Sequence, residues 1–273
     1  MATVGIATGA GRGMGLACAR RMSSLVDVLL VVDRDEIGLS SAAQGLAATA
    51  PVAAVEPFPI DVTDDDGVAR LASRVEELGS LRAVAHAAGI SPTMSDWRQI
   101  LVVDLVGTAK LLEALRPLAT RGTATVCFAS MAPFLANGDT DSAADTAIDD
   151  PLGEDMLERL HDALGPAIED TGAAYVWAKR GIHRLVRREA VSLGPVGARV
   201  CSVSPGIIDT PQGRQEAASH PFMAELVKKT PLGREGRAEE VAAVVAFLLS
   251  DEAGFVNGTD VLVDGGVCAA IRG

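Results

Sequence analysis

Short apolar runs alternate along the chain with longer stretches in which apolar residues recur every three to four positions. The short runs predict strands, and the longer stretches predict amphipathic helices. Strands are expected at residues 3–7, 25–32, 52–58, 81–87, 123–129, 199–204 and 259–264. Helices are expected at residues 16–24, 36–50, 67–78, 100–117, 173–193 and 238–249. This alternation is typical of a parallel sheet covered on both faces, so we predict one doubly wound α/β domain with a seven-stranded sheet over residues 1–273.

Two segments depart from the alternation. Residues 131–172 are rich in Asp, Ala and Gly and helix-like only at 154–164, with too few large apolar side chains for a core of their own. They are therefore expected to be an insertion within the domain. Its helical apolar face either covers a substrate cleft or packs outside the 173–193 helix, and the sequence leaves both arrangements open; this face consists of Met156, Leu157, Leu160 and Leu164. Residues 207–232 form a long connection, as active-site lids often do.

Composition narrows the class of protein. The net charge of −12 and the pI of about 4.8 argue against nucleic acid or an anionic membrane surface as a partner, because both would repel the chain. The chain leads directly into its first strand, and no apolar run approaches the roughly 20 residues of a membrane span. We therefore expect a cytoplasmic protein.

No metal site is expected from the sequence. The four cysteines lie far apart in apolar surroundings, which is typical of buried thiols; they are Cys18, Cys127, Cys201 and Cys268. The four histidines have no ligand spacing, and His183 is expected to be structural. An acidic stretch also lacks the calcium-loop pattern and is expected to be solvated; it contains Asp141, Asp145, Asp149 and Asp150.

A glycine-rich segment lies between the first strand and the first helix. Gly9, Gly13 and Gly15 have the spacing G-x-x-x-G-x-G, and Asp33 ends the second strand. Glycines allow a tight turn and close approach to a pyrophosphate, while the following helix directs its N–H groups at that charge. A bare glycine triplet is equally typical of an ordinary turn. The strand, the helix and the acidic residue about 20 positions further on favour a dinucleotide site.

Tyr175 and Lys179 are four residues apart in the predicted 173–193 helix, so their side chains share one face. An ammonium group ~4 Å from a phenol contributes ~4 kcal/mol at an effective dielectric constant near 20, enough to lower the tyrosine pKa from ~10 to ~7. Ser130 follows the fifth strand, at the sheet edge where α/β folds bind ligands. Taken alone, the Tyr175–Lys179 spacing is more typical of a partly exposed tyrosine beside a solvated lysine, and acid–base chemistry at that edge is the alternative.

These features, in this order, resemble the short-chain dehydrogenase/reductase family over nearly the whole chain. The matching positions are Thr8, Gly9, Gly13, Met14, Gly15, Asp33, Asp61, Val62, Ala87, Ala88, Gly89, Ser130, Tyr175, Lys179, Pro205, Gly206, Thr210, Asn257, Gly258, Asp264, Gly265 and Gly266. The long interval between Ser130 and Tyr175 is similar to that of bacterial 3α-hydroxysteroid dehydrogenase/carbonyl reductase. The resemblance implies a Rossmann fold, hydride transfer between NAD(H) and a secondary alcohol or ketone, and a homodimer or homotetramer.

The resemblance also implies roles for individual residues. Tyr175 would be the general acid/base, Ser130 would hydrogen-bond the substrate oxygen, and Lys179 would tune Tyr175 and bind the nicotinamide ribose. Asp104 stands where the family has a catalytic asparagine, and we expect it to substitute in the proton relay. His86 replaces the asparagine usual before Ala-Gly and is expected to replace a structural hydrogen bond. Cofactor contacts are expected from Gly9, Arg12, Gly13, Met14, Gly15, Asp33, Arg34, Asp61, Val62, Ala88, Gly89, Tyr175, Lys179, Pro205, Gly206, Ile208 and Thr210.

The cofactor and substrate classes follow from these roles. Asp33 favours NAD over NADP, because its carboxylate would repel a 2′-phosphate, although Arg12 and Arg34 act in the opposite direction. An apolar flap over the cleft would favour a bulky steroid- or terpenoid-like alcohol. Two alternatives are a non-catalytic dinucleotide sensor, disfavoured by the intact Ser130, Tyr175 and Lys179, and a sugar-nucleotide epimerase of the extended type, disfavoured by the short stretch after Gly266.

Overall fold

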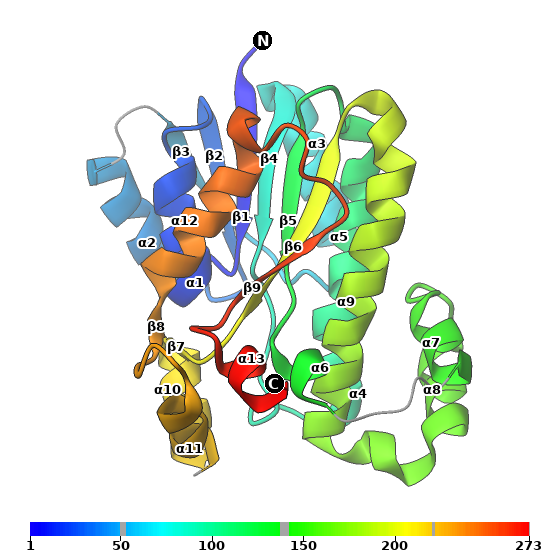
Figure 1. Ribbon diagram of the computed structural model, residues 1–273. Coiled ribbons are helices and arrows are strands. Elements are labelled where there is room, and N and C mark those ends of the chain that lie inside the picture. The colour runs from blue at the N-terminus through cyan, green and yellow to red at the C-terminus, as the bar shows by residue number, and fades with distance from the viewer. Residues whose placement is uncertain (50–52, 137–141, 220–221, 273) are drawn as a thin grey trace.

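A parallel seven-stranded sheet forms the centre of the protein (Figure 1). The computed structural model describes residues 1–49, 53–136, 142–219 and 222–272. In spatial order the strands are β3 (Ala54–Pro59), β2 (Val28–Asp33), β1 (Thr3–Thr8), β4 (Ser80–His86), β5 (Ala124–Phe128), β6 (Arg199–Pro205) and β9 (Asp260–Val263). Successive strands are added on one side of β1 as far as β3, and from β4 onward on its other side, so the strand order reverses between β1 and β4. Open α/β sheets bind ligands in the crevice at such a point.

Helices cover both faces of this sheet. One face carries α1 (Gly13–Met22), α2 (Glu36–Thr49) and α12 (Ala238–Leu249), and the other carries α3 (Asp65–Leu78), α5 (Gly107–Leu115) and α9 (Thr171–Leu193). Successive side chains of β2 serve the two cores in turn: Leu29 and Val31 pack with the first set, whereas Leu30 and Val32 pack with the second. Because both faces are covered, the strands read as continuous apolar runs rather than as alternating ones.

The predicted fold class, strand number and element order are confirmed, although several boundaries shift. The first helix begins at Gly13 rather than at residue 16 and ends at Met22. The second helix and third strand were expected to reach residues 50 and 52, which lie outside the described residues. The last of the predicted helices, α12, is found at its predicted bounds.

The predicted 100–117 helix is a composite. It consists of α4 (Trp97–Leu101), a π-helical segment η1 (Val102–Val106), α5 and a short 3₁₀ turn η2 (Arg116–Leu118). π-Helical turns are rare and occur often at functional sites. Asp104 lies in this segment, so the departure from α-helical geometry coincides with a predicted site residue.

The 131–172 insertion forms short helices: α6 (Ala132–Leu135), α7 (Ser142–Ile148), α8 (Met156–Leu164) and the 3₁₀ turn η3 (Gly165–Glu169). Figure 1 shows α7 and α8 beside α9, away from the sheet, and Met156 and Leu160 are buried there. Of the two arrangements left open by the sequence, packing outside α9 is the one observed for α7 and α8.

The prediction that the acidic stretch is solvated is wrong for its central residues. Asp145 pairs with Arg180 at 2.6 Å and with Arg184 at 3.4 Å, and Asp149 pairs with Arg184 and Arg188. The three arginines recur every fourth residue along α9 and meet carboxylates of equal spacing at the end of α7. Asp141 lies outside the described residues.

The 207–232 connection carries two further helices, α10 (Pro211–Ser219) and α11 (Phe222–Lys229), below the carboxyl edge of the sheet (Figure 1). It also contributes β7 (Ile208–Asp209), which pairs with β8 (Gly236–Arg237). Near the C-terminus, α13 (Val267–Arg272) packs against α11 and α6. The sheet edge is therefore walled by α6, α10, α11 and α13.

The expectation that the cysteines are buried thiols is confirmed. All four cysteines are free and buried. His183 makes structural contacts, with its Nε2 2.9 Å from Ser204 Oγ and 3.3 Å from Asp260 Oδ1. Within the described ranges there is no cluster of three potential metal ligands. Nor does any helix in those ranges have the length and apolar character needed to cross a membrane.

Candidate active site

A cavity of about 510 Å³ opens at the carboxyl edge of the sheet. Seventeen of the predicted site residues line it, and they come from or just after the strands β1 to β7 and from α1 and α9. They are Gly9, Arg12, Gly13, Met14, Gly15, Asp33, Arg34, Asp61, Val62, Ala88, Gly89, Ser130, Tyr175, Pro205, Gly206, Ile208 and Thr210. Lys179 and Asp104 lie behind this lining and are fully or almost fully buried.

The glycine-rich loop has a backbone conformation and a close packing that only glycine allows at several positions. Gly9 and Gly13 have φ values of +62° and +59°, a left-handed conformation that L-residues rarely adopt. A Cβ atom at Gly15 would lie 2.2 Å from the carbonyl oxygen of Gly9. The glycines thus close the turn and place the first turn of α1 at the cavity, where its N–H groups fit a pyrophosphate.

Asp33 ends β2 beside this loop and organises its backbone. Its Oδ2 accepts a hydrogen bond from the Gly11 N–H at 3.0 Å, and its Oδ1 accepts one from the Asp35 N–H at 3.0 Å. Arg12 and Arg34 line the same end of the cavity, and Arg34 Nη1 lies 4.0 Å from Asp61 Oδ2. The adenosine end of the predicted site therefore contains both the expected carboxylate and the opposing cations.

Ser130 and Tyr175 meet at the other end of the cavity. Ser130 follows β5, and its Oγ accepts a hydrogen bond from the Ala132 N–H at 3.1 Å. A hydrogen bond also links the Ser130 and Tyr175 side chains. Tyr175 projects from the first half of α9, which Asp170 caps by accepting from the Ala173 N–H at 2.8 Å.

Lys179 lies one turn further along α9, behind Tyr175. Its Nζ is 5.4 Å from the centroid of the Tyr175 ring and donates to the Phe128 carbonyl at 3.2 Å. The same Nζ lies 3.1 Å from Asp104 Oδ2. The ammonium group is therefore shared between the tyrosine and a buried carboxylate.

Asp104 has no exposed surface and is held at both carboxylate oxygens. Oδ1 accepts from the Ile90 N–H at 2.8 Å, and Oδ2 forms the ion pair with Lys179. Burial raises the pKa of Asp104, an effect that Lys179 and the Ile90 N–H only partly oppose. Burial alone would lower the pKa of Lys179, but the charge of Asp104, the charge of Tyr175 and the hydrogen bond to Asp104 together outweigh it, so the pKa is raised. The lysine therefore stays protonated.

The expectation of a low pKa for Tyr175 is wrong. Burial raises its pKa and is the largest influence, Lys179 lowers it less, and Asp104 and Glu216 raise it further. The main physical reason is burial, which disfavours the charged phenolate, and Asp104 adds to it by cancelling part of the lysine field on which the expectation depended. Tyr175 therefore remains protonated well above neutral pH.

A buried hydrogen-bonded chain joins the glycine-rich loop to the π-helical segment. Thr8 Oγ1 lies 2.8 Å from His86 Nδ1, His86 Nε2 lies 3.0 Å from Thr108 Oγ1, and Thr108 Oγ1 donates to the Asp104 carbonyl at 2.6 Å. The hydroxyl of Thr8 also accepts from the Ala88 N–H at 3.0 Å.

Counting donors in this chain assigns the histidine tautomer. The Thr108 hydrogen is used on a carbonyl, so His86 Nε2 must donate to that hydroxyl, and Nδ1 accepts from Thr8. Burial and the nearby Lys179 lower the pKa of His86 to about 3, which keeps it neutral. The sequence predicted one replaced hydrogen bond at His86 but not the links to Thr8 and Thr108, because partners distant in sequence leave no periodic signal.

The substrate end of the cavity was largely missed by sequence reasoning. Most of its walls are apolar side chains from separate loops and short helices, with one carboxylate, Glu216. The apolar members are Met94, Met131, Leu135, Val176, Phe222, Met223 and Leu226. Only the position of Met131 beside Ser130 and the lid-like length of 207–232 signalled this wall.

Comparison with known proteins identifies the family. Residues 9–144 and 164–268 match the sequence model of a family described as enoyl-(acyl carrier protein) reductase. A short-chain dehydrogenase/reductase of Alternaria brassicicola is 33% identical, covering 96% of this chain and 94% of that protein. The chain belongs to the short-chain dehydrogenase/reductase family. The unmatched residues 145–163 fall within the insertion that carries α7 and α8.

Other short-chain dehydrogenases/reductases are similar over equally long stretches. The cis-4-hydroxycyclohexanecarboxylate dehydrogenase of Sinomonas cyclohexanicum is 31% identical, covering 97% of this chain and 96% of that protein. The crystal structure of levodione reductase has a TM-score of 0.76 and 29% identity, covering 98% of each chain. The protein is thus an oxidoreductase of the short-chain type, and this family binds a nicotinamide dinucleotide.

Proposed function

We propose that this protein interconverts a secondary alcohol and a ketone using NAD(H), with Tyr175 as the general acid/base. The observation that carries the proposal is the meeting of Ser130 and Tyr175 in the same cavity as the glycine-rich loop, with Lys179 directly behind the phenol. Relatives whose names specify an alcohol or a ketone support the reaction class. When bound, the nicotinamide supplies the hydride acceptor or donor.

Each of the four polar side chains at the site has its own role in this proposal. Ser130 donates a hydrogen bond to the substrate oxygen and holds it beside the Tyr175 hydroxyl. In oxidation the deprotonated Tyr175 removes the hydroxyl proton as the hydride leaves the adjacent carbon, and in reduction the protonated Tyr175 returns that proton. Lys179 stabilises the phenolate and is available to the nicotinamide ribose. Asp104 holds Lys179 in place and moderates its field.

The pKa of Tyr175 sets the direction of the pH dependence. Because its pKa is raised, Tyr175 is protonated at neutral pH, which suits ketone reduction. Alcohol oxidation needs the phenolate, so its rate should rise as the pH increases above neutral. The two directions should therefore have separate pH optima, with oxidation at the higher pH.

The substrate is proposed to be a bulky, apolar, steroid- or terpenoid-like alcohol or ketone. The apolar walls from α6 and α11 support this class, because they contact the end of the cavity beyond Ser130 and Tyr175. NAD is proposed as the preferred cofactor, since Asp33 lines the adenosine end of the cavity.

A panel of secondary alcohols and ketones, followed by nicotinamide absorbance, tests the activity. In Tyr175→Phe, turnover should fall by the 10²–10⁴-fold typical of general acid–base catalysis, while NADH binding stays largely intact because only the hydroxyl is lost. Lys179→Ala should impair both. A phenylalanine variant that keeps more than about a tenth of the wild-type rate would contradict the assignment. Binding of NADH without turnover of any compound would instead favour a dinucleotide sensor.

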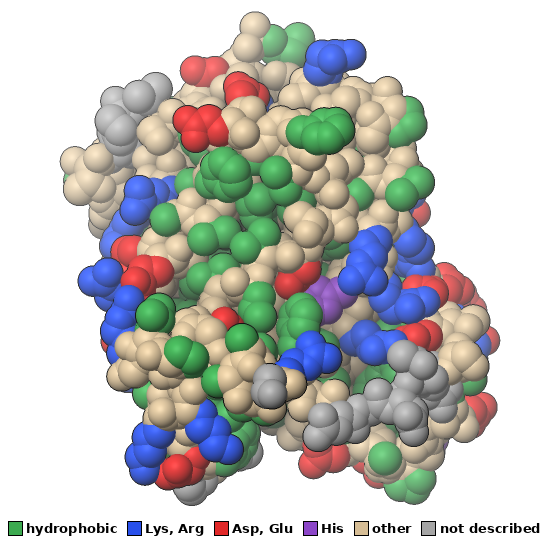
Figure 2. Space-filling view, viewed as in Figure 1, with side chains coloured by type: hydrophobic (Ala, Val, Ile, Leu, Met, Phe, Trp, Pro, Cys, Tyr) green, Lys and Arg blue, Asp and Glu red, His purple; other side chains and the backbone are tan. Residues whose placement is uncertain are grey.

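The protein is also proposed to form a homodimer or homotetramer. Phe247, Phe255 and Leu262 are exposed large apolar residues on or near α12 and β9, and Figure 2 shows hydrophobic side chains gathered there. Among the described strands β9 pairs only with β6, so its outer edge is unpaired. Exposed apolar patches beside open strand edges are commonly covered by a partner. Light scattering should give a mass of two or four chains, and a single-chain mass would contradict this proposal.

A further inference from the structure

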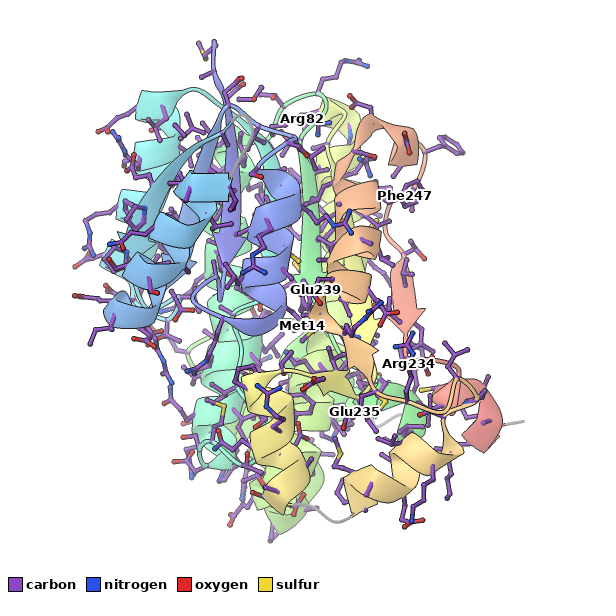
Figure 3. The ribbon with its side chains drawn as sticks, turned by 90° about the vertical axis from the view of Figure 1, so that its left-hand side faces the viewer. Met14, Arg82, Arg234, Glu235, Glu239 and Phe247 are labelled. Atoms are coloured by element: carbon purple, nitrogen blue, oxygen red, sulfur yellow. The ribbon has the colours of Figure 1, made fainter. Side chains whose placement is uncertain are left out.

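The helix α13 lies behind the substrate end of the cavity. It packs against α11 and α6, and Figure 3 shows α13 (faint red) beside α11 (faint orange), below the labelled Arg234. Its first two residues, Val267 and Cys268, are only 0% and 3% exposed. A helix of six residues is too short to be stable by itself, so tertiary contacts must hold α13 in place.

Asp264 fixes the start of α13. This residue follows β9, and its Oδ1 and Oδ2 accept hydrogen bonds from the N–H groups of Gly266 and Cys268, each at 2.8 Å. The carbonyl oxygen of Gly265 accepts a hydrogen bond from the Leu232 N–H at 3.3 Å. The first turn of α13 is thereby attached both to the sheet and to the end of the 207–232 connection.

A single buried apolar cluster joins α13 to the cavity wall; it consists of Met131, Ile207, Met223, Val267 and Cys268. The first three of these residues also line the cavity, whereas the two residues of α13 lie behind that lining. Methionine side chains are unbranched and flexible, so they adjust to the space that their neighbours leave. The room behind Met131 and Met223 therefore determines how far these side chains extend into the cavity.

We propose that Val267 is a positioning residue that sets the size limit of the substrate, acting through Met131 and Met223. The inference deepens the proposed function and rests on it. A smaller residue at this position should let the two methionines withdraw and lengthen the cavity, because a void behind them is unfavourable. A larger residue should push them inward and shorten the cavity, because the cluster is already closely packed.

A series of 4-alkylcyclohexanones, from methyl to hexyl, measures the length of the cavity. Their dissociation constants are determined by calorimetry for the enzyme–NAD⁺ complex, in which the ketone cannot be reduced. Each methylene group that becomes buried should strengthen binding by up to about fourfold, until the alkyl group reaches the wall. The longest group that still strengthens binding should be about one carbon longer in Val267→Ala than in the wild type, and about one carbon shorter in Val267→Ile.

Val75→Ala is the matched control, because Val75 of α3 is 1% exposed in a separate core cluster and loses the same two methyl groups. It should lower stability without changing the size limit. If Val267→Ala fails to fold, the shorter limit in Val267→Ile still tests the inference.

The inference is overturned by equal limits in the wild type and the Val267 variants, by a shorter limit in Val267→Ala, or by an equal shift in Val75→Ala. A wild type that binds no member of the series overturns it as well. Turnover is measured separately with NADH. If the size limits shift as expected but no ketone is reduced, it is the proposed function that fails.

Discussion

At the scale of single residues, Asp104 sets the electrostatics behind the candidate acid/base. Its Oδ1 accepts from the Ile90 N–H, and its Oδ2 pairs with Lys179. An asparagine can keep the first contact through its amide oxygen but carries no charge. Asp104→Asn therefore separates the structural role from the electrostatic one.

The sign of the effect follows from the influences on Tyr175. Asp104 raises the tyrosine pKa, and Lys179 lowers it. Removing the negative charge leaves the lysine field unopposed, so the pKa of Tyr175 should fall and alcohol oxidation should reach half its maximal rate at a lower pH. The pH profile of kcat for wild type and Asp104→Asn measures this. An unchanged profile, or one shifted to higher pH, would show that Asp104 does not act through the charge of Lys179.

Residue identities were easier to predict than their environments. The Tyr175–Lys179 spacing indicated a shared helix face, so these two residues were expected to interact. Asp104 was recognised as standing at an asparagine position of the family. The pKa of Tyr175 was predicted in the wrong direction, because its burial depends on packing between segments far apart in the chain rather than on nearby sequence. The buried partners of His86 are likewise set by strand neighbours far apart in the chain.

At the scale of elements, the ion pairs between α7 and α9 attach the insertion to the helix that carries Tyr175 and Lys179. Arg184 is central to them, since it contacts both Asp145 and Asp149. Burial is only partial, and the side chains remain about one-third exposed or less at Arg184 and Asp149. Removing one partner of these ion pairs should therefore lower the free energy of unfolding more than at an isolated surface pair, but far less than at a fully buried pair.

Arg184→Ala should lower the free energy of unfolding by about 1 kcal/mol, and high salt should reduce the difference from wild type. Denaturant unfolding at low and at high ionic strength measures both effects. Arg187→Ala is the matched control, because Arg187 is exposed on the same helix and outside this set of pairs. Equal destabilisation by both variants, or a difference that salt does not alter, would contradict this account of the attachment.

The orientation of the insertion was only partly readable from the sequence. The apolar spacing of Met156 and Leu160 predicted a helix with one buried face, and that face is observed. Apolar surface was available both at the cleft and outside α9, so hydrophobicity alone did not distinguish the two. Asp145 and Asp149 have the same four-residue spacing as the arginines of α9. This match could have indicated that the insertion packs outside α9.

At the scale of the whole molecule, the cavity connects the two halves of the sheet. Its walls run from Asp33 at the end of β2 to Ser130 after β5 and Pro205 at the end of β6. The sequence predicted the number and succession of the strands, because each is a buried apolar run. Their spatial order depends on crossovers that leave no periodic pattern, so the β1–β4 crevice became visible only in the structure.

A cofactor that spans both halves should stabilise the domain as one unit. A ligand at 100 times its dissociation constant adds ~2.7 kcal/mol to the free energy of unfolding, which corresponds to a Tm increase of several degrees. At equal concentrations NADH should raise the Tm more than NADPH, because the Asp33 carboxylate would face the 2′-phosphate of NADPH.

Asp33→Asn tests the cause of this difference. The amide oxygen can still accept one of the backbone hydrogen bonds that Asp33 accepts from Gly11 and Asp35, while the negative charge is lost. The gap between the NADH and NADPH thermal shifts should therefore narrow, mainly through stronger NADPH binding next to Arg12 and Arg34. An equal or greater stabilisation of the wild type by NADPH would mean that the two arginines outweigh the carboxylate, and the preference for NAD would be wrong.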